Sequence, residues 1–352
     1  MRKRAAQIGA GVAVSALALW LTLRGKDLGA MWAAMRAADY RYLVPYFGIL
    51  LAIHVIRTVR WGLLLRSIAP VPFARLNAIA AVGFMALTLL PFRLGEFARP
   101  LLIAERPRLR TSAALSSIVV ERAADGLFMG VLLLMALLAL PDDTPGVAIL
   151  RVGGAVVSLV FAGIIAFLVF AYRSRARAVR LAVRLLSPLS QRVAERAAGM
   201  LDAFIHGLRV LPGPGSIALF FVLTAANWGL NAFGMRLLAL GFGFDLGPLQ
   251  SCAVLGMLVV GVMIPSGPGM VGTFQGAVVV GLSLFAPAEA VATRGIAYAN
   301  VLWAAQLLQI TALGLAFVPS AHVKLGRLTG AAGEVGAGLE AEETEYREAE
   351  GG

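Results

Sequence analysis

The chain has 352 residues, of which 59% are hydrophobic and only 14% are charged. Soluble proteins carry roughly 25% charged residues, so this composition excludes a cytosolic enzyme, a secreted disulfide scaffold and a disordered protein. The net charge of +12 would suit nucleic acid, but the basic residues gather at the ends and loops of apolar segments. That placement is typical of membrane proteins beside anionic lipid headgroups, and we expect no nucleic-acid partner.

A helix needs about 20 apolar residues to cross the hydrocarbon core of a bilayer. Apolar segments that predict membrane helices follow one another at 5–23, 42–65, 76–91, 94–104, 112–140, 146–171, 216–240, 249–264, 269–286 and 295–318. Leu28, Met31, Trp32 and Met35 predict a short interfacial helix between the first two segments. The predicted fold class is all-α, a polytopic transmembrane helical bundle.

The domain prediction is a transmembrane domain at 1–320, with halves at about 1–140 and 146–320, and an acidic disordered tail at 321–352. The segment 172–214 is rich in arginine and predicts a cytoplasmic loop that contains an amphipathic helix. The loop 141–145 has no lysine or arginine and is expected outside. The N-terminus and the tail are then cytoplasmic, although several basic residues in 24–41 fall on the outer side against the rule.

Two segments share a helix-breaking pattern. An apolar run ends at Pro91–Gly95, another of equal length ends at Pro265–Gly269, and each resumes as a second apolar run. Proline removes a backbone donor, and glycine permits a sharp reversal. Such breaks predict two broken, re-entrant helical hairpins. They enter from opposite sides, which predicts an inverted-topology repeat with a site at the interface of the halves.

Charged residues inside the apolar segments indicate a polar cavity, because each costs about 2.5–3.5 kcal/mol in lipid by insertion scales. They are Arg57, Arg60, Glu96, Arg99, Glu121, Arg122, Asp125 and Arg236, and Arg93 lies beside them in the first break. Glu121 and Asp125 share one helix face, and we expect them to pair with Arg57 and Arg60, below His54. Two alternatives stay open: the arginines snorkel to the interface, or the charges form a structural network that binds no ligand.

The excess of arginine suggests an anionic ligand, since arginine binds phosphate through two parallel hydrogen bonds. We predict that Arg93 and Arg99 form the clamp. At the second break, Pro265, Gly267 and Gly269 would offer backbone groups, and Gln275 a side-chain amide. The three histidines are too scattered to form a metal site, and no cofactor is expected.

Four motifs resemble one known family. They are Arg57-x-x-Arg60-Trp61, Pro91–Pro100 (PFRLGEFARP), Glu121–Asp125 (ERAAD) and Pro265–Gly272 (PSGPGMVG). In this order and spacing, over about residues 5–320, they resemble the lysylphosphatidylglycerol synthase transmembrane region, a flippase-like family of bacterial and archaeal membrane proteins.

The resemblance implies a polytopic inner-membrane protein that handles or translocates polar lipids. Aminoacyl-phosphatidylglycerol synthases carry a soluble synthase domain after this region, whereas a short acidic tail follows here, so we expect no aminoacyl transfer. The family often has glutamate where this chain has Gln275, which puts coupling or selectivity in question.

The leading functional prediction is a non-enzymatic lipid flippase or transporter for an anionic polar lipid or a polyprenyl-phosphate lipid. There is no Walker A pattern that would indicate direct use of ATP. The alternatives are an intramembrane lipid-modifying enzyme and a non-transporting partner of a cell-envelope synthase.

Overall fold

The computed structural model describes residues 2–66, 70–90, 95–104, 111–139, 147–188, 191, 198, 213–264, 266–321, 328, 330–331, 333–339 and 341–342. Its helices are α1 (Arg2–Leu23), α2 (Leu28–Ala37), α3 (Leu43–Leu65), α4 (Phe73–Leu89), α5 (Ala98–Ala104), α6 (Thr111–Leu138), α7 (Val147–Arg173), α8 (Arg175–Leu186), α10 (Pro214–Leu240), α11 (Pro248–Met263), α12 (Thr273–Leu282), α13 (Ala288–Ala290) and α14 (Ile296–Ala321). No strand occurs in this part of the chain, and the predicted all-α bundle is confirmed.

The bundle has the dimensions and surface of a membrane protein. Within the described ranges, the helical segments long and apolar enough to cross a bilayer are Tyr40–Leu65, Leu150–Arg173, Gly215–Leu240 and Ala288–Ala321. The outer face of α7 shows why lipid is needed: Val152 is 65% exposed and Leu159 is 72% exposed. Apolar side chains of this kind, in a continuous stripe, are stable against lipid tails and costly in water.

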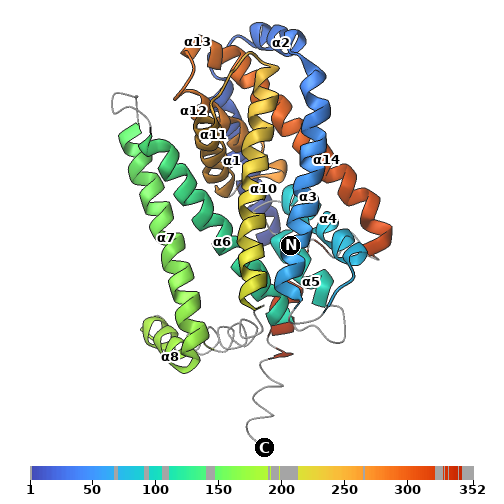
Figure 1. The fold of residues 1–352 in the computed structure, drawn as a ribbon, viewed down its shortest axis with the longest axis vertical. Coiled ribbons are helices and arrows are strands. Elements are labelled where there is room, and N and C mark those ends of the chain that lie inside the picture. Colours follow the sequence, from blue (N-terminus) through green and yellow to red (C-terminus); the bar gives the residue numbers. More distant parts are fainter. Residues whose placement is uncertain are drawn as a thin grey trace, which may run out of the picture.

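The two ends of the bundle differ in chemistry. The amphipathic helix α8, with Arg177 and Arg180 exposed, lies at one end, and α2 lies at the other (Figure 1). The helix α2 matches the predicted interfacial segment and is capped by Asp27, whose carboxylate accepts a hydrogen bond from the Ala30 N–H at 3.0 Å. Its Trp32 is 55% exposed, as expected for a side chain at headgroup depth.

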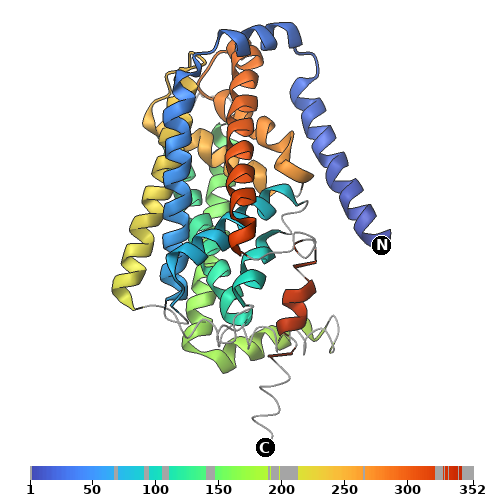
Figure 2. The same cartoon turned by 90° about the vertical axis from the view of Figure 1, so that its right-hand side faces the viewer.

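The packing of the helices follows the predicted repeat. In the first half α3 contacts α4 and α6, and α5 contacts α6; in the second half α10 contacts α11 and α14, and α12 contacts α14. The halves join through equivalent pairs, because α3 packs on α10, α4 on α14 and α11 on α6. The helix α3 runs from the α2 end toward the α8 end, and α10 runs the opposite way (Figure 1), so the two units have opposite directions. The peripheral helices do not follow this symmetry: α7 packs on α6, whereas α1 runs along the edge of the bundle and packs on α12 (Figure 2).

Both predicted helix breaks are present. At the first, α4 ends at Leu89 and α5 begins at Ala98; residues 91–94 lie outside the described part. A Cβ atom at Gly95 would overlap the backbone carbonyl of Ala86, so only glycine allows the chain to fold back this closely on α4.

The second break separates α11 from α12 and is held by α1 and α14. The Gly267 N–H donates to Ser15 Oγ at 2.9 Å, and the Gly269 carbonyl accepts from Trp303 Nε1 at 2.7 Å. Gly272 has φ of 84°, and a Cβ atom there would lie 2.5 Å from the Ser15 carbonyl oxygen. A helix from outside the hairpin therefore fixes the shape of the break.

The tail differs from the predicted disorder over the residues that the structure describes. Residues 333–339 are helical, and Val335 and Leu339 are buried against Leu101 of α5. The Glu342 carboxylate accepts hydrogen bonds from the backbone N–H groups of Thr111 and Ser112, the latter at 3.2 Å. It thereby caps the N-terminus of α6, where a negative charge is favoured. The i, i+4 spacing of Val335 and Leu339 is the feature of the sequence from which this helix could have been predicted.

Candidate functional site

A cavity of about 440 Å³ lies between the two halves, beside both helix breaks. Its polar lining residues are Arg57, Thr88, Glu96, Arg122, Asp125, Asn227, Trp228, Asn231 and Gln306. Leu87 at the end of the first broken helix and Met270 within the second break also line it. The predicted location, at the interface of the repeat, is therefore where the structure has its polar cavity.

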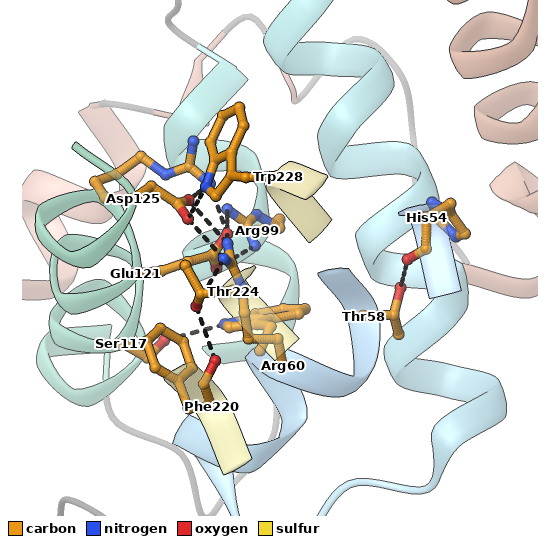
Figure 3. Close-up of polar contacts among 12 residues, drawn as sticks. His54, Thr58, Arg60, Arg99, Ser117, Glu121, Asp125, Phe220, Thr224 and Trp228 are labelled. Carbon is orange, nitrogen blue, oxygen red and sulfur yellow. Dashed lines mark hydrogen bonds and ion pairs between the residues drawn. The ribbon is translucent and has the colours of Figure 1, made fainter. Parts of the chain in front are cut away.

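One wall of the cavity is backed by a buried ion-pair network (Figure 3). Arg60 of α3 binds Asp125 of α6 through two parallel hydrogen bonds, Nη1 to Oδ1 at 2.6 Å and Nη2 to Oδ2 at 2.8 Å. Arg60 Nη1 also donates to Thr224 Oγ1 at 3.1 Å, and Trp228 Nε1 donates to Asp125 Oδ1 at 3.0 Å. Side chains from α3, α6 and α10 thus meet at one carboxylate, which ties the two halves together.

Glu121, one turn before Asp125 on α6, is fully buried and forms ion pairs with three arginines. Arg99 Nη1 of α5 donates to Glu121 Oε2 at 2.9 Å, and Arg60 Nη2 donates to Oε1 at 3.3 Å. Arg122 donates to the same Oε1 and lies 3.4 Å from Asp125 Oδ2. The two carboxylates and three guanidinium groups form one continuous network, in which each charge has a partner of opposite sign.

Arg99 lies behind the cavity wall rather than in the cavity. Its guanidinium group stacks over the rings of Trp61 at 5.1 Å and Phe84 at 4.7 Å, while Trp61 Nε1 donates to Ser117 Oγ at 3.1 Å. A Cβ atom at Gly83 would overlap the Arg99 side chain, so α4 has glycine where Arg99 crosses it. A guanidinium group buried between aromatic rings and a carboxylate stabilises the fold. The predicted role of Arg99 in a ligand clamp is therefore not supported.

Arg57 differs from the other described arginines around the cavity. Its guanidinium group lies over the Phe84 ring at 3.7 Å, the residue lines the cavity, and no described carboxylate forms an ion pair with it. The predicted pairing of Arg57 with Glu121 or Asp125 is therefore wrong, because Arg60, one turn further along α3, forms the contacts to these carboxylates. Arg57 is therefore a cation beside the cavity that has no carboxylate partner among the described residues.

The remaining predicted site residues lie away from the cavity, make other contacts or fall outside the described residues. Arg236 Nη2 lies 3.7 Å from Oδ1 of Asp245, which is largely exposed, and Arg236 does not line the cavity.

Gln275 is buried, and its Oε1 accepts a hydrogen bond from the Gly272 N–H at 2.7 Å, so it caps α12. A glutamate oxygen can accept the same hydrogen bond in a capping box. Gly267 and Gly269 direct their polar groups at α1 and α14, and His54 binds Asn77 at 2.9 Å rather than the arginines. Arg93 and Pro265 lie outside the described residues.

The second half contributes residues that the sequence prediction did not place in the site. On α10 these are Thr224, Asn227, Trp228 and Asn231, and on α14 Gln306. The α10 residues recur every three or four positions in an otherwise apolar helix, so they form one polar face. That spacing is the feature of the sequence from which the polar face of α10 could have been predicted.

Comparison with known proteins assigns the chain to a family. No curated protein and no solved structure matches it. Residues 8–314 match the family described as the lysylphosphatidylglycerol synthase TM region. Because the match covers most of the chain, including both helix breaks and the ion-pair network, this protein belongs to the family of the lysylphosphatidylglycerol synthase transmembrane region.

Proposed function

We propose that this protein moves the polar headgroup of an anionic lipid across the membrane through the cavity between its two halves. The observation that carries the proposal is the polar cavity at the interface of two oppositely oriented units, beside two helix breaks. This arrangement is the one by which secondary transporters give a midplane site access to each side in turn. Family membership supports a membrane protein of lipid synthesis or flipping.

The charges around the cavity favour an anion. Asp125 is neutralised by Arg60, and Arg122 by Glu121 and Asp125, whereas Arg57 has no carboxylate partner among the described residues. An uncompensated guanidinium group at membrane depth is costly and is retained mainly where it has a function. A phosphate bound at Arg57 would neutralise it through two hydrogen bonds. The apolar lining residues, such as Leu87 and Phe161, would accommodate the first part of the lipid tail.

We infer an inner-membrane location with the α8 end in the cytoplasm, because α8 carries four arginines in its 12 residues. Basic residues at the α2 end are compensated locally, which reduces the conflict with this orientation. Arg24 lies over the Trp20 ring at 4.7 Å, Arg36 lies over Trp32 at 5.5 Å, and Arg41 binds Asp39 at 2.9 Å.

The test is translocation in proteoliposomes. Purified protein is reconstituted with fluorescent phosphatidylglycerol, and a membrane-impermeant quencher reports the lipid that remains outside, with and without a pH gradient. We expect protein-dependent translocation that Arg57→Gln abolishes and that Arg177→Gln on α8 leaves unchanged. Translocation by Arg57→Gln at the wild-type rate, or none by the wild-type protein under either condition, would overturn the proposal.

A further inference from the structure

A second, smaller cavity of about 60 Å³ adjoins the first and shares Arg57, Asn231 and Gln306 with it. His54 and Gln309 complete its polar lining. No aspartate or glutamate occurs among its described lining residues, and Arg57 is a permanent cation there. A group bound in this cavity therefore meets a positive charge that no lining carboxylate balances.

The amide side chains around this cavity supply hydrogen-bond donors. Gln309 Nε2 is buried, and no group in the described part of the chain accepts a hydrogen bond from it. Gln306 Nε2 donates to Tyr46 Oη at 2.9 Å. Asn231 Nδ2 donates to the Asn227 carbonyl at 2.8 Å. An amide nitrogen carries two N–H groups, so each of these side chains has a second one besides this contact. Since buried donors in native proteins have acceptors, we expect a bound acceptor at Gln309.

The size of the cavity restricts what the acceptor is. Its volume of about 60 Å³ equals that of two water molecules at roughly 30 Å³ each. A monatomic anion with one water molecule fits this space. A phosphodiester with two ester substituents is larger, and the neighbouring cavity of about 440 Å³ offers it the room that it needs.

The charge of Arg57 favours an anion over water alone. Its guanidinium group lies over the Phe84 ring at 3.7 Å and forms no ion pair with a described carboxylate. A charge at membrane depth is costly unless it is paired, and an aromatic face compensates it only in part. Water molecules would fill the smaller cavity without neutralising the guanidinium group, whereas a monovalent anion would do both.

We propose that the smaller cavity is a binding site for a monatomic, monovalent anion such as chloride. The anion accepts a hydrogen bond from Gln309 Nε2 and neutralises Arg57, and the amides of Asn231 and Gln306 complete its surroundings. This inference goes beyond the proposed function, because the anion site does not require that the larger cavity takes up a lipid.

The experiment measures the width of the chloride NMR signal in the presence of the full-length protein, purified in a non-ionic detergent. Chloride that exchanges with a protein site gives a broader signal, and the saturable part of the broadening reports the affinity of a defined site. We expect a saturable component with a dissociation constant in the millimolar range. Bromide should displace it, because its charge is the same and its size is similar. Inorganic phosphate at the same concentration should not, because it is too large for the smaller cavity.

Variants place the site within the structure. Gln309→Leu should weaken chloride binding about tenfold, the effect of one hydrogen bond to a charged group. Gln309→Glu, which keeps the size of the side chain and adds a carboxylate, should abolish the saturable component, and so should Arg57→Gln. One matched control is Asn300→Leu on the same helix, because the Asn300 amide bonds to the Ile296 carbonyl at 3.0 Å. The other is Arg177→Gln, an exposed arginine on α8. Both controls should bind chloride as the wild type does.

Three results would overturn the inference, and the first two need only the wild-type protein. The first is the absence of a saturable component. The second is displacement of chloride by phosphate as readily as by bromide, which would place the anion in the larger cavity. The third is a saturable component that both Gln309→Glu and Arg57→Gln retain, because the anion would then bind elsewhere on this basic protein.

Discussion

Removal of Arg60 tests whether the buried charges act as one network. Arg60→Gln deletes the two hydrogen bonds to Asp125 and the contact at 3.3 Å to Glu121, at a side chain that is fully buried. Removing one partner of a buried pair costs about 3–5 kcal/mol, because the other charge is left uncompensated. Asp125 would keep Trp228 and the contact to Arg122 at 3.4 Å, so we expect about 3 kcal/mol, the lower end of this range.

A double-mutant cycle measures how much of this cost belongs to the pair. In Arg60→Gln/Asp125→Asn both members are neutral, and Glu121 keeps Arg99 and Arg122. The double variant should therefore be more stable than the sum of the single variants predicts, by about 1–3 kcal/mol. The free energy of unfolding is measured by titration with sodium dodecyl sulfate in mixed micelles.

The matched control for this cycle is Arg177→Gln on α8, an exposed arginine that should change the free energy of unfolding by less than about 0.5 kcal/mol. Strict additivity between Arg60→Gln and Asp125→Asn would refute the network. So would an effect of Arg60→Gln no larger than that of the control, because both results would mean that Arg60 is solvated independently of Asp125.

Three further changes test individual contacts. Gly83→Ala should displace Arg99 and lower the free energy of unfolding by about 1–3 kcal/mol, whereas Gly163→Ala, which meets open space, should not lower it. Gln275→Ala should lower the free energy of unfolding by about 0.5–2 kcal/mol through loss of the cap on α12; an unchanged free energy of unfolding would exclude a capping role. Glu342→Gln should speed amide exchange in the first turn of α6, and unchanged exchange there would mean that the tail does not cap this helix.

The hydropathy of the sequence was enough to predict the helices and the two breaks, because lipid imposes a minimum apolar length and proline and glycine interrupt it. Pairing of Arg60 with Asp125 could also be predicted, since two carboxylates on one face of α6 need cations from another helix. The distinct positions of Arg57 and Arg60 could not be predicted. They depend on how far α3 is rotated about its axis, and both residues lie on the same apolar segment.

The role of Arg99 could not be read from the sequence either, because the reversal at the first break decides whether α5 presents it to the cavity or to α6. The packing of the described part of the tail could not be predicted for a different reason. Its many glutamates indicated disorder, whereas Val335 and Leu339 supply just enough apolar surface to pack on Leu101. In both cases the deciding contacts join residues far apart in the sequence.

The central claim is that a lipid headgroup enters the cavity and binds at Arg57. The most direct measurement is photo-crosslinking from an unnatural amino acid at Val259, in the cavity lining, and separately at Leu159, on the outer face of α7. The probe is phosphatidylglycerol with an isotopic label in its headgroup. The account predicts headgroup crosslinks at Val259 that Arg57→Gln removes, and weak crosslinks at Leu159 that do not change. No crosslink at Val259, or one that Arg57→Gln leaves intact, would contradict it.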